Sequence, residues 1–154
     1  YPGRVRSLAL IDTKSGADSE EGKANRDTRA ERLLEIGRDQ LAKDLQEGLL
    51  GPEPSLSARS RLRSMVEDCP YETSVGALPG MRDRPDRTHV LAGIGAPTAV
   101  IVGEHDSLTP VADADAMASA LPDAELTVVP DAGHMSPIEN PGGVNAALAA
   151  LLER

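Results

Sequence analysis

The 154-residue sequence carries 16 Lys and Arg against 25 Asp and Glu, a formal charge of −9 at pH 7, which argues against a nucleic-acid-binding function. Hydrophobic residues make up 40% and charged residues 27%, as in globular domains, and with two Tyr, no Phe and no Trp the core must be aliphatic. No apolar stretch approaches the roughly 18 residues of a membrane span, and the lone Cys69 favours a reducing, cytoplasmic compartment.

Three short apolar runs predict β-strands, at residues 5–11, 98–102 and 126–129. Runs that are apolar on both faces are typical of a parallel sheet covered by helices on either side. The sequence therefore predicts an α/β fold with three parallel strands and flanking helices.

Residues 14–88 separate the first two predicted strands. Segments around 28–36, 39–50 and 55–68 are predicted to be helices, because apolar residues such as Leu33, Leu62 and Met65 recur at spacings of three and four. A crossover between parallel strands needs far fewer residues. We therefore expect a helical cap at 14–88, between a first core strand segment at 1–13 and a carboxyl-terminal α/β core at 89–154.

The carboxyl-terminal core should alternate strands and helices. After the strand at 98–102, Thr109 can cap a helix that Pro110 opens, and after the strand at 126–129 Asn140 and Pro141 can do the same. The apolar residues expected to face the core from the last helix are Val144, Leu148, Leu151 and Leu152.

Polar residues follow the second and third predicted strands, at the sheet edge where parallel sheets bind ligands. Asp106 comes after the strand at 98–102, and His134 comes after the strand at 126–129. An Asp that accepts a hydrogen bond from one imidazole nitrogen leaves the other nitrogen free to act as a general base. Each residue alone is more often a turn former or a surface residue, but their joint placement favours a catalytic pair.

Residues 97–106, Pro-Thr-Ala-Val-Ile-Val-Gly-Glu-His-Asp, resemble the acid-bearing strand and loop of the α/β-hydrolase family. Residues 130–134, Pro-Asp-Ala-Gly-His, are similar to the histidine turn of that family, and residues 1–5 resemble the segment that enters its sixth strand. The resemblance implies a partial α/β-hydrolase fold and a Ser-His-Asp hydrolase of an ester, lactone or related acyl bond. It also implies that Asp106 orients His134 and that the enzyme needs no cofactor.

The nucleophile of this family lies on a G-x-S-x-G turn, and that motif does not occur in the 154 residues. We therefore expect the carboxyl-terminal half of an enzyme, inactive alone, with its nucleophile encoded upstream of Tyr1. Ser107 and Ser136 lie near the pair in sequence, but no strand-to-helix turn presents either of them. Dehalogenase and haloperoxidase chemistry stay open, because the type of nucleophile separates them from esterases.

Two other classes of function remain. The chain could be a non-catalytic remnant that docks with itself or with another chain through the open edge of its first strand, or a small-molecule-binding module that uses the cap. A metal site built from His105, Asp131 and His134 is not expected, because H-x-H and H-x-x-x-H spacings are missing.

Overall fold

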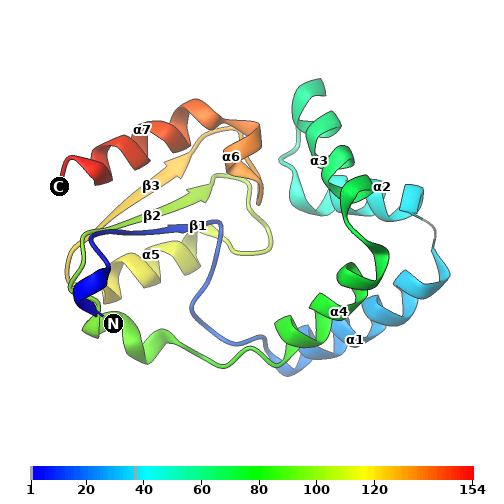
Figure 1. Ribbon diagram of the computed structural model, residues 1–154, viewed down its shortest axis with the longest axis horizontal. Helices are drawn as coiled ribbons and strands as arrows, with labels where there is room; N and C mark the ends of the chain where they lie inside the picture. The colour runs from blue at the N-terminus through cyan, green and yellow to red at the C-terminus, as the bar shows by residue number, and fades with distance from the viewer. Residues whose placement is uncertain (1, 37) are drawn as a thin grey trace.

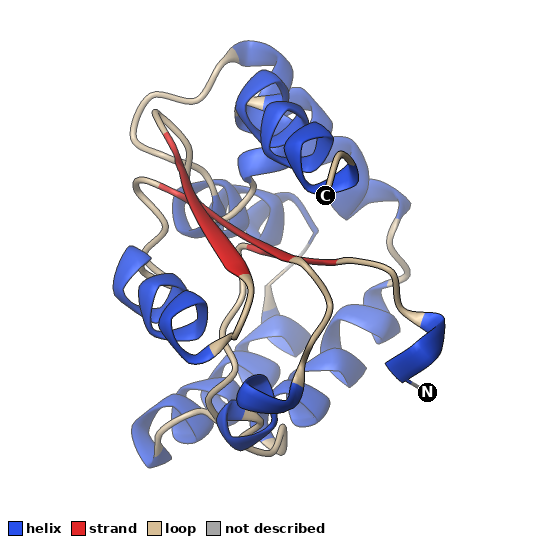
Figure 2. Ribbon diagram, turned by 90° about the vertical axis from the view of Figure 1, so that its left-hand side faces the viewer, coloured by secondary structure: helices blue, strands red, loops and turns tan. Residues whose placement is uncertain are grey.

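Three parallel strands form the centre of the computed structural model, which describes residues 2–36 and 38–154; Tyr1, where the family resemblance begins, lies outside them. The strands are β1 (Leu8–Ile11), β2 (Thr98–Gly103) and β3 (Ala124–Val129), in the order β1-β2-β3. Figure 1 shows α7 (Pro141–Leu152) on one face of the sheet and α5 (Val111–Ala120) on the other. The predicted α/β fold is confirmed, and the twisted sheet between the two helices is clearest in Figure 2.

The central strand β2 is buried along its whole length, which explains why its sequence is apolar from Ala99 to Val102. Val100 and Val102 point to one face, where they pack with Met117 of α5. Ala99 and Ile101 point to the other face, where they pack with residues of α7. The alternation of side chains along a strand therefore divides the aliphatic core of the sheet into two layers.

The two outer strands differ in length from the prediction. The run at 5–11 is too long, because pairing starts at Leu8 opposite Thr98, and Val5 is 51% exposed. A short 3-10 helix, η1 (Pro2–Arg4), precedes this run. At the other edge, β3 begins two residues before the predicted start, since Ala124 already pairs with Thr98.

Between β1 and β2 the described residues form four helices, α1 (Glu20–Glu35), α2 (Arg38–Leu49), α3 (Leu56–Asp68) and α4 (Tyr71–Arg82), followed by the 3-10 helix η2 (Thr88–Gly93). We call α1–α4 the helical insertion. The predicted helix at 28–36 was too short, because the Ser19 side chain caps α1 by accepting a hydrogen bond from the Gly22 amide. The sequence did not predict α4 at all. It lies beside α1 (Figure 1) and buries Leu78 in the core of the insertion.

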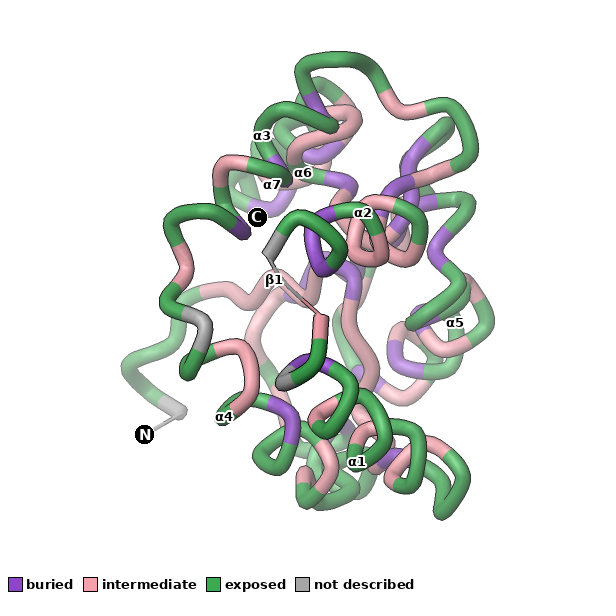
Figure 3. The backbone as a smooth tube through the Cα atoms, turned by 90° about the vertical axis from the view of Figure 1, so that its right-hand side faces the viewer, coloured by how far each residue is buried: buried purple, intermediate pink, exposed green. Residues whose placement is uncertain are grey.

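The helical insertion has an aliphatic core of its own, separate from those of the sheet. Its buried residues are Leu33, Leu41, Ala42, Leu50, Leu62, Val66 and Leu78. Met65 was expected to join them but is 41% exposed, and Figure 3 shows that most of α1 is also exposed. Met135 and Ile138, which follow β3, pack against this core. The insertion therefore rests on the segment that carries His134.

Hydrogen bonds join the segments that enter and leave the helical insertion. The Arg87 amide donates to the Ser15 carbonyl at 2.9 Å, and the hydroxyls of Ser15 and Thr88 lie 3.0 Å apart. Nearby, the Arg84 guanidinium donates to the Gly16 carbonyl at 3.0 Å. The chain thus leaves the sheet and returns to it at nearly the same point.

The last helix begins as predicted, with the Asn140 side chain accepting a hydrogen bond from the Gly143 amide at 3.0 Å. Val144 and Leu151 are buried, but Leu152 is 79% exposed, so the prediction for that residue was wrong. Thr109 was also assigned wrongly as a helix cap, because Pro110 takes the cap position of α5. Within the described ranges, no helix combines the length and the hydropathy needed to cross a membrane.

Candidate active site

Asp106 and His134 lie in two loops that leave the same edge of the sheet. The register pairs Gly103 with Val129, so the loops after β2 and β3 start side by side. Asp106 Oδ2 and His134 Nδ1 lie 2.8 Å apart, within hydrogen-bonding distance. The structure therefore brings together the two residues that the sequence selected.

The Asp106 side chain is fully buried and held by three further hydrogen bonds. Its Oδ1 accepts from the amides of Leu108 and Thr109, both at 2.9 Å, and its Oδ2 accepts from the Thr109 hydroxyl at 2.7 Å. Burial by itself would raise the pKa of Asp106, but the hydrogen bonds from His134 and Thr109 outweigh it and hold the pKa below its usual range. Asp106 is thus an ionised, rigid acceptor for the imidazole.

The His134 side chain remains 24% exposed, so the ring borders both the interior and the solvent. Its hydrogen bond to Asp106 raises the pKa of the imidazole; burial opposes this, while the charges of Asp106 and Asp12 add to it. The Thr109 hydroxyl is also 3.3 Å from Nδ1. With Nδ1 as the donor to Asp106, Nε2 is the nitrogen that can accept a proton.

A second buried carboxylate, Asp12, lies directly after β1. Its Oδ1 accepts from the Gly103 amide at 3.0 Å, and its Oδ2 accepts from the Ser136 amide at 2.9 Å and the Ser136 hydroxyl at 2.7 Å. Burial raises its pKa, and these three hydrogen bonds only partly compensate. Asp12 thereby joins the ends of β1 and β2 to the turn after His134.

Sequence reasoning missed Asp12. The signal was present, because Asp12 follows its strand just as Asp106 and His134 follow theirs. Asp12 also has a φ of 44°, in the left-handed region that Asp tolerates better than most residues.

The two serines near the pair are placed differently. Ser136 is completely buried and its hydroxyl donates to Asp12, whereas Ser107 is exposed. In the described part of the chain, the hydrogen-bond partners of His134 Nδ1 are Asp106 and Thr109 rather than a serine.

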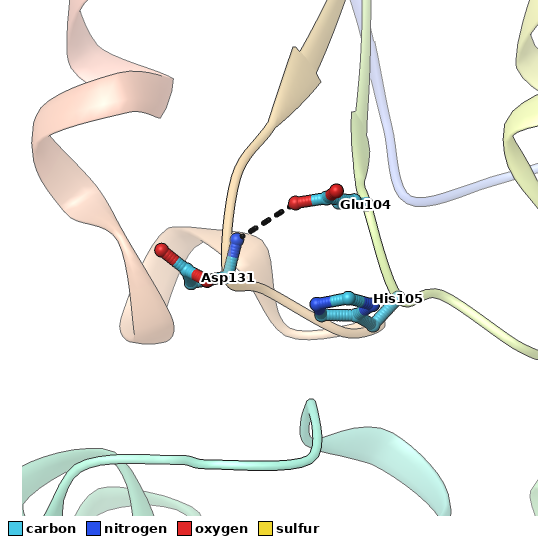
Figure 4. Close-up of side chains that lie close together, drawn as sticks. All are labelled: Glu104, His105 and Asp131. Carbon is cyan, nitrogen blue, oxygen red and sulfur yellow. Dashed lines mark hydrogen bonds between the residues drawn. The ribbon is translucent and has the colours of Figure 1, made fainter.

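Glu104, His105 and Asp131, from the loops after β2 and β3, gather at the surface (Figure 4). The structure therefore joins Asp131 to His105 and Glu104, and not to His134. Their ligand atoms lie within 4.8 Å of one another, and Glu104 Oε2 accepts from the Asp131 amide at 3.3 Å. One imidazole and two carboxylates can bind zinc. All three residues are exposed, however, and such groups are common without an ion, so we assign no metal to them.

A cavity of about 370 Å³ separates His105 from the loop between α2 and α3. Its other lining residues are Gln46, Glu47, Leu50, Gly51, Pro52, Pro54 and Arg59. The helical insertion thus faces the loop that carries Asp106.

Residues 1–141 match a family model described as the alpha/beta hydrolase fold. The chain is 34% identical to an esterase from Thermogutta terrifontis, with a TM-score of 0.89, over 99% of this chain and 57% of that one. An enol-lactonase from Burkholderia xenovorans is similar in fold, with a TM-score of 0.80 and 21% identity over 98% of this chain and 57% of that one. A probable proline iminopeptidase from Leptolyngbya boryana is 50% identical over 38 residues, 25% of this chain and 12% of that protein. The chain therefore spans just over half the length of these solved structures.

Proposed function

The chain belongs to the alpha/beta hydrolase fold family, and from this membership we propose that its protein hydrolyses an ester, a lactone or a related acyl bond. The observation that carries the proposal is the 2.8 Å contact between His134 Nδ1 and the buried carboxylate of Asp106. The similarity to an esterase along nearly the whole chain favours acyl substrates.

In the proposed mechanism, His134 acts as general base and general acid. Asp106 holds Nδ1 as a proton donor, so Nε2 can take the proton from an attacking hydroxyl and return it to the leaving group. The imidazolium that forms in between is stabilised by the Asp106 charge, which also raises the pKa of His134 in the resting protein. We therefore propose that the rate rises with pH through a midpoint above the ordinary histidine value of about 6.5.

The proposed nucleophile is a serine encoded outside these 154 residues. Ser136 is a poor candidate, because its hydroxyl is bound to Asp12. Ser107 lies in the loop of Asp106 and is exposed, with no turn of the kind that presents a nucleophile. We also propose that the helical insertion acts as a cap over the strand ends and shapes the substrate pocket.

The test uses the full-length protein from the gene that encodes this chain, assayed with p-nitrophenyl acetate and a small lactone. Asp106→Asn should lower kcat by about 10⁴-fold, and His134→Gln by at least as much. His105→Gln is the matched control, since this neighbouring imidazole is exposed whereas the ring hydrogen-bonded to Asp106 is that of His134. A His134→Gln variant that retains the wild-type rate contradicts the proposal.

A fluorophosphonate probe tests the origin of the nucleophile. We expect the probe to label the full-length protein and to leave the 154-residue chain unlabelled. Labelling of any serine in the 154-residue chain would refute the proposal that the nucleophile lies elsewhere.

The second candidate is a docking module that associates through β1. It is favoured by the position of β1 at an edge of the described sheet. Size-exclusion chromatography separates the candidates, because a discrete dimer of the full-length protein without esterase activity would support docking over catalysis.

A further inference from the structure

The carboxylate of Glu139 binds two backbone amides that come from distant parts of the chain. Glu139 ends α6 (Ser136–Glu139), a single turn that follows His134. Its Oε1 accepts from the Gly51 amide at 2.7 Å, and its Oε2 accepts from the Gly133 amide at 2.8 Å. Gly51 belongs to the loop between α2 and α3, and Gly133 directly precedes His134. One side chain thus connects the helical insertion to the histidine turn.

The backbones at this junction are in direct contact. A Cβ atom on Gly133 would lie 2.6 Å from the Gly51 nitrogen, and one on Gly103 would collide with the carbonyl oxygens of Gly133 and Ala132. The His105 amide also donates to the Ala132 carbonyl at 2.8 Å. Backbone therefore packs directly on backbone where the end of β2, the histidine turn and the loop between α2 and α3 meet. A displacement of one of these segments must displace its neighbour.

Packing around the junction joins the same two parts. Leu50, next to Gly51, is buried in the core of the insertion, and Met135 and Ile138 pack against that core from either end of α6. In Figure 1, α6 lies between α3 and the sheet. The insertion therefore docks on the segment that carries His134 through both apolar and hydrogen-bonded contacts.

We propose that Glu139 is a positioning residue that couples the place of the helical insertion to the orientation of His134. The inference rests on the proposed function only for the catalytic meaning of His134, since the coupling itself is mechanical. A carboxylate suits this role because it offers acceptors to both amides, and charge-assisted bonds are about twice as strong as neutral ones. A glutamine would keep one acceptor and turn an NH₂ group toward the other amide.

The first experiment measures amide hydrogen exchange in the full-length protein with Glu139→Gln. The variant removes the bond to one amide and leaves a weaker, neutral bond to the other, so exchange should accelerate at both Gly51 and Gly133, by about tenfold or more at the amide that loses its acceptor, while the β2 amides of Val100 and Val102 keep their rates. Glu53→Gln is the matched control, because Glu53 is an exposed carboxylate in the same loop as Gly51. Unchanged exchange at Gly51, or acceleration at Gly133 alone, overturns the coupling.

The second experiment starts from the insertion, in case Glu139→Gln lowers the stability of the whole protein. Gly51→Ala places a Cβ atom 3.2 Å from the Gly133 nitrogen and 3.3 Å from Glu139 Oε1, and Gly48→Ala is its control, with no neighbouring atom within 4 Å of the added Cβ. Coupling predicts that Gly51→Ala shifts the imidazole NMR resonances of His134, assigned with His134→Gln, and accelerates exchange at Gly133. If both stay at their wild-type values, the proposal is refuted.

These readouts require no catalysis, so they separate the coupling from the proposed activity. If the full-length protein hydrolyses esters, Glu139→Gln should also lower kcat about tenfold or more, and Glu53→Gln should leave kcat unchanged. A normal kcat together with faster exchange at Gly51 and Gly133 would overturn the positioning role of Glu139.

Discussion

Replacing Asp12 with Asn removes a charge from the interior while preserving the shape of the side chain. Asp12 accepts hydrogen bonds from the Gly103 amide and from the amide and hydroxyl of Ser136. The Asn oxygen can accept the two hydrogen bonds from Ser136. Its NH₂ group then faces the Gly103 amide, and two donors cannot form a hydrogen bond with each other. Asn tolerates the positive φ of this position, so the backbone adds no strain.

The expected destabilisation is about 2 kcal/mol. A buried donor that loses its acceptor costs about 1–3 kcal/mol, and the remaining bonds to Ser136 weaken because their acceptor becomes neutral. Burial disfavours the ionised form of Asp12 and raises its pKa, so removing this buried charge offsets part of the loss. The variant should also lower the pKa of His134, because the Asp12 charge helps to raise it.

Urea unfolding at pH 7 gives the change in stability, and an NMR titration of the His134 ring gives its pKa. Asp131→Asn is the matched control: Asp131 also follows a strand with a positive φ, of 55°, but its side chain is exposed. The reasoning fails if the two variants unfold with free energies within about 0.5 kcal/mol of each other. It also fails if the pKa of His134 stays constant or rises in Asp12→Asn.

Two further changes test other parts of the fold. The hydrogen bond from Arg26 lowers the pKa of Asp18 to about 2, so the stability that Asp18 contributes is present above the unfolded value of about 3.9 and is lost as the pH falls toward 2. Asp18→Asn should therefore cost about 2 kcal/mol at pH 7 and nothing near pH 2, and equal losses at both pH values in thermal unfolding would contradict this. Gly133→Ala should destabilise the fold by about 2 kcal/mol, because the added Cβ collides with the Gly51 backbone. Gly142→Ala is the control and should be tolerated, since its added Cβ has its nearest neighbour at 3.7 Å. Equal melting temperatures of the two variants would be inconsistent with the close contact.

The elements that were predicted well are recognisable from residues within them or next to them in the sequence. β2 follows Pro97, ends at Gly103 and is apolar from Ala99 to Val102, as a strand covered on both faces requires. The last helix was predicted from Asn140 and Pro141, whose roles depend on the neighbouring residues alone. α4 could not be predicted in this way, because Gly76 and Pro79 disfavour a helix. Its formation depends on packing against α1, which is distant in the sequence.

For the candidate site, strand-end reasoning selected Asp106 and His134 and overlooked Asp12 and Glu139. The sequence marks Asp12 as the residue that follows β1, but its partners Gly103 and Ser136 come from the other end of the chain and are known only from the fold. Glu139 binds a loop 88 residues away in sequence, and no local pattern marks such a partner. Residues that connect separate elements therefore require the fold, whereas residues that end an element can be found without it.

The bonds between Ser15 and Arg87 and between Ser15 and Thr88 make the entry and exit of the helical insertion a single anchored point. The roughly 70 residues between these bonded segments form a closed loop. Once its ends are joined, pairing β1 with β2 requires closing only the short segments between the bonds and the strands, which costs little conformational entropy. Lengthening or shortening the helices beyond that anchor would leave the spacing of β1 and β2 unaltered. Such an arrangement lets evolution change the length of these helices while β1 and β2 keep their pairing.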